Sequence, residues 1–243
     1  MELAVLRKKR IRMLLLNLAY FLVLLVIGIF LFLTGAGRWI YLPAAAAIVF
    51  YLLLVRPVRK NYENDLRTAI LQHSVLDRLQ EASYQRKEGL PSSYLIDAGF
   101  INVIDPRSYL SRERITGNAG RQQVEMADVV FPFRENGLNK MFNGCMIRIV
   151  SPGVEYPELD VRGGDFSSLP AGRERKLAEK LGSYIPGSLS LHRSGDTLSI
   201  LLRGRFIGFP INPLGEVNES TLNSDPLPEF GTALELARLN AKL

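Results

Sequence analysis

The chain has 243 residues and a net charge of +6, and the distribution of that charge excludes one class of function. Residues 1–60 hold nine Lys and Arg against one Glu, whereas residues 61–243 hold 21 Lys and Arg against 23 Asp and Glu. A nucleic-acid-binding domain needs its positive charge on its folded surface, so we expect no nucleic acid partner. The single cysteine, Cys145, excludes an intrachain disulfide and fits a reducing cytosol.

Two apolar runs without charged residues dominate the N-terminal part. The first covers residues 13–34 and the second covers 39–55, with the four residues Gly-Ala-Gly-Arg between them. A helix rises about 1.5 Å per residue and must cross about 30 Å of hydrocarbon, so about 20 residues span a bilayer. The pattern predicts a transmembrane helical hairpin within residues 1–60.

Two other interpretations of these runs are open. A signal peptide also has a basic start and an apolar core, but that core is usually about 7–15 residues long. Alternatively, the Ala-rich second run is buried inside a soluble fold. The length of the first run and the second run that follows it at once favour the transmembrane hairpin.

Basic residues flank the two runs and predict their orientation. Five precede the first run and three follow the second, whereas only Arg38 lies between them. Since short basic flanks resist translocation, we expect a multi-pass protein of the cell (inner) membrane with both termini cytoplasmic. The flanking residues are also expected to contact the anionic inner leaflet of the lipid bilayer: Arg7, Lys8, Lys9, Arg10, Arg12, Arg56, Arg59 and Lys60.

An amphipathic helix is predicted after the anchor. Residues 61–88 contain no Gly or Pro, and apolar residues such as Leu66 and Ile70 recur at helical spacing. Gly89 and Pro91 mark its end. We therefore expect a stalk helix over residues 61–90, followed by a cytosolic domain over 91–243.

The cytosolic domain reads as strands joined by hairpins, with helices beside them. Hairpin connections imply an antiparallel sheet, so the fold class is α+β with a mainly antiparallel sheet and flanking helices. The expected strands are 108–115 and 121–133 around a turn at 117–120, 143–150, and 188–193 with 197–209. A loop is expected over 151–170, and helices over 171–181, capped by Ser167 or Ser168, and over 231–243.

The sequence contains no recognisable catalytic, cofactor or metal motif. His73 and His192 have no Cys or His at ligand spacing, and no nucleotide-binding glycine loop or nucleophile elbow occurs. Glu113 and Glu125, opposite each other in the first hairpin, read as solvated charges rather than a carboxylate pair. Residues 162–165 (Arg-Gly-Gly-Asp) read as a turn. We therefore expect no catalytic residue, no metal and no cofactor, and an enzyme is the less favoured interpretation.

Arg203 and Arg205 are the candidate ligand-binding residues. They flank Gly204 at the end of a predicted strand, where two guanidinium groups could meet a phosphate or a carboxylate. The alternative is that Gly204 forms a bulge and both arginines face water.

The arrangement resembles an uncharacterised bacterial membrane-protein family of unknown function. The resemblance rests on the apolar hairpin and stalk, on residues 109–117 (YLSRERITG) followed by 129–133 (VVFPF), and on 196–200 (DTLSI) before a closing helix. It implies a two-helix N-terminal anchor before a cytosolic α+β domain, and it carries no catalytic residue.

These observations favour a non-enzymatic, membrane-anchored scaffold or adaptor. It is expected to self-associate as a homo-oligomer through anchor and stalk, or to join another membrane protein in a larger complex. One alternative is a membrane-tethered enzyme or ligand-binding domain with an unrecognised site. The other is an accessory subunit of a transporter.

Overall fold

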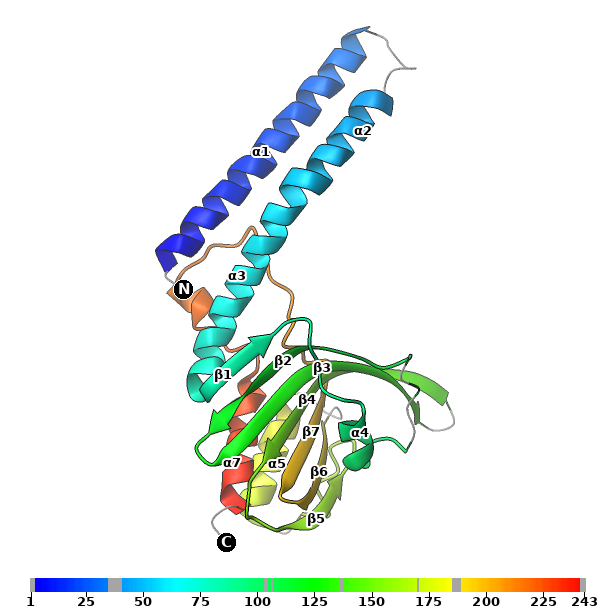
Figure 1. Cartoon of the computed structure of the whole chain (residues 1–243), viewed down its shortest axis with the longest axis vertical. Helices are drawn as coiled ribbons and strands as arrows, with labels where there is room; N and C mark the ends of the chain where they lie inside the picture. The colour runs from blue at the N-terminus through cyan, green and yellow to red at the C-terminus, as the bar shows by residue number, and fades with distance from the viewer. Residues whose placement is uncertain are drawn as a thin grey trace. The chain divides into compact units, whose positions relative to one another are not determined.

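The computed structural model describes residues 3–34, 41–102, 105, 107–135, 138–169, 171–184 and 189–240. The chain forms two compact units (Figure 1). One contains Met1–Ile70 and Pro210–Ser224, and the other contains Leu71–Phe209 and Asp225–Leu243. The turn predicted at 35–38 lies outside the described residues.

The first unit contains the long apolar helix α1, Leu3–Thr34. Among the described residues it is the one helix long and apolar enough to cross a membrane. The second apolar run forms α2, Tyr41–Phe50, and a π-helical turn at Tyr51–Val55, and α3, Arg56–Ser74, follows directly. The wide turn directly precedes Pro57, which has no N–H to donate to the carbonyl four residues earlier.

The two apolar segments contact each other through aromatic rings. Tyr20 of α1 stacks on Phe50 at a centroid distance of 6.1 Å and lies 5.5 Å from the ring of Tyr51. Segment 210–224 belongs to the same unit and carries the short helix α6, Glu219–Leu222, capped by Asn218. Arg7 and Arg10 donate to the carbonyls of Val217 and Leu214, which fixes this segment to the base of α1.

The second unit is a seven-stranded antiparallel sheet with helices, so the predicted α+β class is confirmed. The strand order is β1-β2-β3-β4-β7-β6-β5. The strands are β1 Gln80–Gln85, β2 Leu110–Ala119, β3 Gln122–Glu135, β4 Leu138–Val150, β5 Tyr156–Val161, β6 Leu189–Gly195 and β7 Thr197–Arg203. The helices are α4 Ser93–Asp97, α5 Arg173–Ser183 and α7 Pro228–Asn240.

Each face of the sheet has its own core, because side chains alternate along the strands. Helices α5 and α7 pack on one face, over residues such as Met126, Cys145 and Ile147. Helix α4 and the residues around it cover the other face, over residues such as Val129 and Met146 (Figure 1).

The stalk helix predicted over 61–90 is wrong in its second half. Helix α3 ends at Ser74, a 3₁₀ turn follows at Leu76–Arg78, and residues 80–85 form the edge strand β1. Strand β1 pairs with β2, as in Ser83 opposite Thr116. Backbone pairing with a distant strand overrides the local helical pattern here.

Several other expected boundaries also differ. Strand β5 lies inside the expected loop 151–170, β4 begins at Leu138 rather than at 143, and the first hairpin turns at residues 120–121. Gly172, not Ser167 or Ser168, precedes α5. Strand β7 ends at Arg203 rather than at 209 because Gly204 has a φ of +76°, which turns the chain out of the sheet.

Candidate functional site

A groove of about 610 Å³ lies on the α4 face of the sheet. Its walls come from segments far apart in the sequence: the ends of β3 and β4, the start of β6, the end of β7, the loop after α4 and the turn after β5. The lining residues are Gly99, Phe100, Ile101, Asn102, Phe131, Pro132, Phe133, Arg134, Asn139, Phe142, Arg162, Gly163, Ser190, Leu201 and Arg203. The volume falls in the range of small-molecule and peptide-binding clefts, about 300–1,000 Å³.

The floor of the groove is aromatic and aliphatic. Phe131 and Phe142 lie opposite each other in the β3–β4 register, and their rings stack with centroids 4.8 Å apart. Leu201 of β7 is buried beside them. Phe133 is two residues after Phe131 on β3, so its side chain lies on the same face of the sheet. The floor therefore offers an apolar surface to a bound group.

The rim of the groove is cationic, and two of its arginines are held in place. The guanidinium carbon of Arg203 lies 5.4 Å from the ring centroid of Phe133, a cation–π arrangement. Arg162 donates to the carboxylate of Asp160 at 2.8 Å and to the carbonyl of Gly99 at 3.0 Å. Among the described residues that line the groove, three are arginines and none is Asp or Glu. Oriented guanidinium groups bind carboxylates and phosphates with little further ordering.

Strands β3 and β4 extend beyond their neighbours as a two-stranded arm (Figure 1). Strand β2 pairs with β3 only as far as Val130, and β7 pairs with β4 only from Gly144, whereas β3 and β4 pair with each other to Glu135 and Leu138. Large apolar side chains are exposed on the arm and beside it: Leu138 by 64%, Leu110 by 53% and Met141 by 50%. Unpaired strand edges beside exposed apolar residues are features of protein-binding surfaces.

The structure separates the two arginines that the sequence singled out. Arg203 lines the groove, whereas Arg205 pairs at 2.5 Å with Glu229, a fully buried residue of α7. Helix α7 packs on the opposite face of the sheet from α4. The turn at Gly204 places the two guanidinium groups in different surroundings, so they do not form a joint site.

The groove includes Arg162, which the sequence suggested only as part of a turn. The 162–165 segment follows directly after β5, a strand that the sequence pattern did not indicate. Phe131 and Phe133 are two residues apart on β3, and this spacing is the sequence pattern that indicates that they share a face of the sheet. What brings them to Arg162 is the long-range order of the strands.

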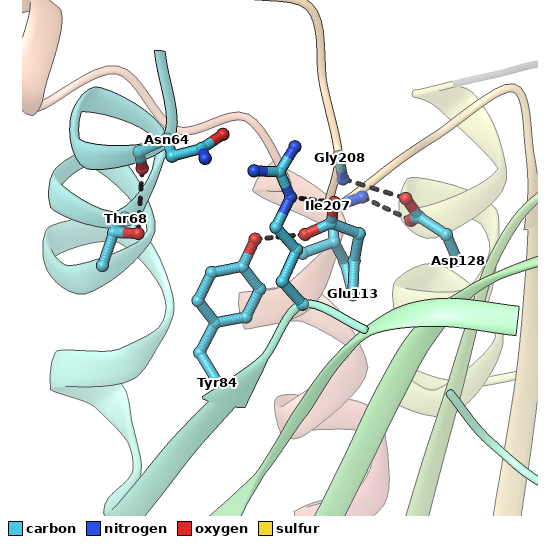
Figure 2. A network of polar contacts seen from close by, with 8 residues as sticks. Asn64, Thr68, Tyr84, Glu113, Asp128, Ile207 and Gly208 are labelled. Atoms are coloured by element: carbon cyan, nitrogen blue, oxygen red, sulfur yellow. Dashed lines mark hydrogen bonds and ion pairs between the residues drawn. The ribbon is translucent and has the colours of Figure 1, made fainter. Parts of the chain in front are cut away.

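A buried polar cluster lies on the α7 side of the same sheet. Both carboxylate oxygens of Asp128 accept backbone N–H groups, from Ile207 at 2.6 Å and from Gly208 at 2.9 Å (Figure 2). The carboxylate of Glu113 accepts from the hydroxyl of Tyr84 and from Arg86. Burial raises the pKa of Asp128 to about 6, while the two N–H donors oppose this shift. Since its acceptors are occupied by backbone donors, Asp128 serves to hold the segment after β7.

The remaining candidates for chemistry have structural partners. Glu113 and Glu125 do not face each other: Glu125 lies opposite Thr116 and pairs with Arg114 and Arg148. Cys145 is buried, and burial raises the pKa of its thiol. Within the part of the chain that the structure describes, no group of three or more His, Cys, Asp or Glu side chains could hold a metal ion.

Comparison with known proteins gives no match. No family model matches the sequence, and neither a curated protein nor a solved structure matches it.

Proposed function

We propose that this protein is a membrane-anchored adaptor whose sheet domain binds an acidic, extended segment of a partner protein in the groove beside the β3–β4 arm. The anchor is a transmembrane helical hairpin formed by residues 13–34 and 39–55, with both termini in the cytoplasm. The length and exposed apolar surface of α1 support it, as do the contacts of Tyr20 with Phe50 and Tyr51.

One observation carries the adaptor proposal: oriented arginines stand beside an apolar floor. Arg203 and Arg162 are fixed by Phe133, Asp160 and Gly99, so a bound carboxylate would meet donors that are already in position. The apolar floor would take alternate side chains of the segment, and the edges of the arm beyond β2 and β7 would offer backbone donors and acceptors. The cationic rim favours an acidic occupant over a neutral one.

The test is a pull-down of the full chain from its native membrane in mild detergent after crosslinking. The wild type is compared with the double variant Arg162→Gln/Arg203→Gln, which removes both oriented charges. The matched control is Arg121→Gln, an exposed arginine in the β2–β3 turn outside the groove. We expect a partner to copurify with the wild type and the control and to be reduced at least tenfold with the double variant.

Other outcomes would redirect the proposal. Equal recovery of the partner with the double variant would exclude the groove as its binding surface. Recovery of this chain alone, at several times 27 kDa, would indicate a homo-oligomeric scaffold instead. If the double variant lost a bound small anion that the wild type retains, but lost no protein partner, the domain would be a membrane-tethered ligand-binding domain. A polytopic transporter among the partners would make this chain its accessory subunit.

A further inference from the structure

A second concave site lies within the first unit, between α1 and α3. It has a volume of about 510 Å³ and is lined by Lys9 and Arg12 of α1 and by Asn61, Tyr62, Asn64 and Asp65 of α3, among others. The cationic and amide groups come from two helices, so the site requires both to be in place.

The site lies close to the level where the uncharged run of α1 ends. Arg12 and Lys9 are one and four residues before Met13, which is about 1.5 and 6 Å along the helix axis. Because Tyr20 contacts Phe50 and Tyr51, Met13 lies about level with residues 57–58 of the antiparallel segment. Asn61 is then about one helical turn beyond the level of Met13. In a membrane-embedded chain this is the interfacial layer, roughly 5–8 Å deep on each side of the hydrocarbon core, where phospholipid phosphates lie.

Four of the five basic residues before the apolar run of α1 form two pairs with different surroundings. Arg7 and Arg10, three residues apart, donate to carbonyl groups of segment 210–224. Lys9 and Arg12, also three residues apart, line the site instead. Arg7 and Arg10 therefore bind α1 to segment 210–224, whereas Lys9 and Arg12 face the site where a ligand could bind.

The charges of the lining residues favour an anion. The ammonium group of Lys9 is held by the carboxylate of Asp65 at 2.6 Å, which orients it beside the site. With Arg12 the lining residues then carry two cations against one carboxylate. The amide group of Asn61 adds a neutral donor of the kind that completes the coordination of a phosphate group.

We propose that this site binds the phosphate of a single anionic phospholipid from the inner leaflet. The inference rests on the membrane anchor of the proposed function, but it does not use the groove. The apolar faces of α1 and α2 above the site would contact the acyl chains, whereas a soluble phosphate ester would lack that contact.

The test uses the purified full chain in mild detergent, titrated with phosphatidylglycerol, phosphatidylethanolamine or glycerol phosphate and followed by native mass spectrometry. We expect one phosphatidylglycerol molecule to bind about fivefold more tightly than phosphatidylethanolamine, and glycerol phosphate not to displace it. Arg12→Gln should weaken phosphatidylglycerol binding about fivefold, as expected for one cation near an anionic surface. Asn61→Ala should weaken it too, without changing charge.

The matched control is Arg56→Gln, an exposed basic residue that also directly flanks an uncharged run but does not line the site. Equal losses with Arg56→Gln and Arg12→Gln would overturn the site in favour of diffuse attraction to the leaflet. Displacement by glycerol phosphate would overturn the lipid as the source of the phosphate. If high salt or carbonate extracted the chain from membranes, the proposed transmembrane anchor would be excluded. Loss of lipid selectivity with the anchor intact would instead remove only this site.

Discussion

The carboxylate of Asp128 accepts the backbone N–H of Gly208 at 2.9 Å, across 80 positions of sequence. Asp128 lies in the third strand of the sheet, and Gly208 lies two residues before the chain leaves this unit at Pro210. The neighbouring N–H of Ile207 occupies the other carboxylate oxygen. The exit of the chain from the sheet domain is therefore fixed by one buried side chain.

Asp128 is expected to give the protein a measurable pH dependence. Burial raises its pKa to about 6 from an ordinary value of 3.8, opposed by the N–H donors of Gly208 and Ile207. A raised folded-state pKa means that the folded state binds the proton more tightly, so this contribution to stability is full below about pH 4 and is lost as pH rises through about 6. A folded-state pKa of about 6 in place of 3.8 corresponds to roughly 3 kcal/mol when the pH is well below both values.

The variant Asp128→Asn isolates this contribution because its amide does not titrate. We expect the free energy of unfolding of the wild type, relative to that of Asp128→Asn, to fall by roughly 2 kcal/mol between pH 4 and pH 7. Denaturant titrations of the detergent-solubilised chain at a series of pH values measure this difference. A constant difference over that range would contradict the assignment.

Gly208 should be sensitive to a single added methyl group. A Cβ at this position would lie 2.9 Å from a carboxylate oxygen of Asp128 and 3.3 Å from the Cγ of Glu113. Gly208→Ala must therefore displace buried groups, and we expect a loss of stability of about 1–3 kcal/mol. The control is Gly215→Ala, where the nearest atoms are 3.4 to 3.6 Å away in Asn212. Equal effects of the two substitutions on the unfolding midpoint would exclude close packing at Gly208.

Arg203 and Arg205 are expected to differ in their structural importance. Arg205→Met leaves the buried carboxylate of Glu229 without its cation, and losing one partner of a buried pair costs about 3 kcal/mol or more. Arg203→Met removes a half-exposed cation–π contact worth about 0.5–1 kcal/mol. The double variant Arg205→Met/Glu229→Met should recover most of the stability lost in Arg205→Met. Thermal unfolding of the three variants measures this, and equal losses for the two single variants would contradict the distinction.

The antiparallel α+β fold could be predicted because its main signals are local. The turn glycines near residue 120 and at Gly195 lie between alternating apolar segments, and hairpins follow from such patterns. Strand β1 could not be predicted in this way. Its residues are exposed or half-exposed and carry no alternating apolar pattern, so only pairing with β2 makes them a strand.

The candidate site was less accessible to sequence reasoning than the fold. Arg203 and Arg205 are adjacent on either side of Gly204, but the positive φ of that glycine sends them to different partners. Arg162 and Phe133 are distant in the chain and line one groove because β7, β6 and β5 follow β4, in that order, in the sheet. Strand order of this kind depends on the whole set of pairings, which no short motif encodes.

The hydrogen bonds of Arg7 and Arg10 to Val217 and Leu214 have a consequence for biosynthesis. A ribosome delivers α1 early, but the carbonyl groups that these arginines bind are translated some 200 residues later. The unit that contains α1 therefore cannot reach its final form until the sheet strands between its two parts have been synthesised. A fragment that ends at Phe209 would contain all seven described strands of the sheet, but Arg7 and Arg10 would lack the carbonyl groups that they bind.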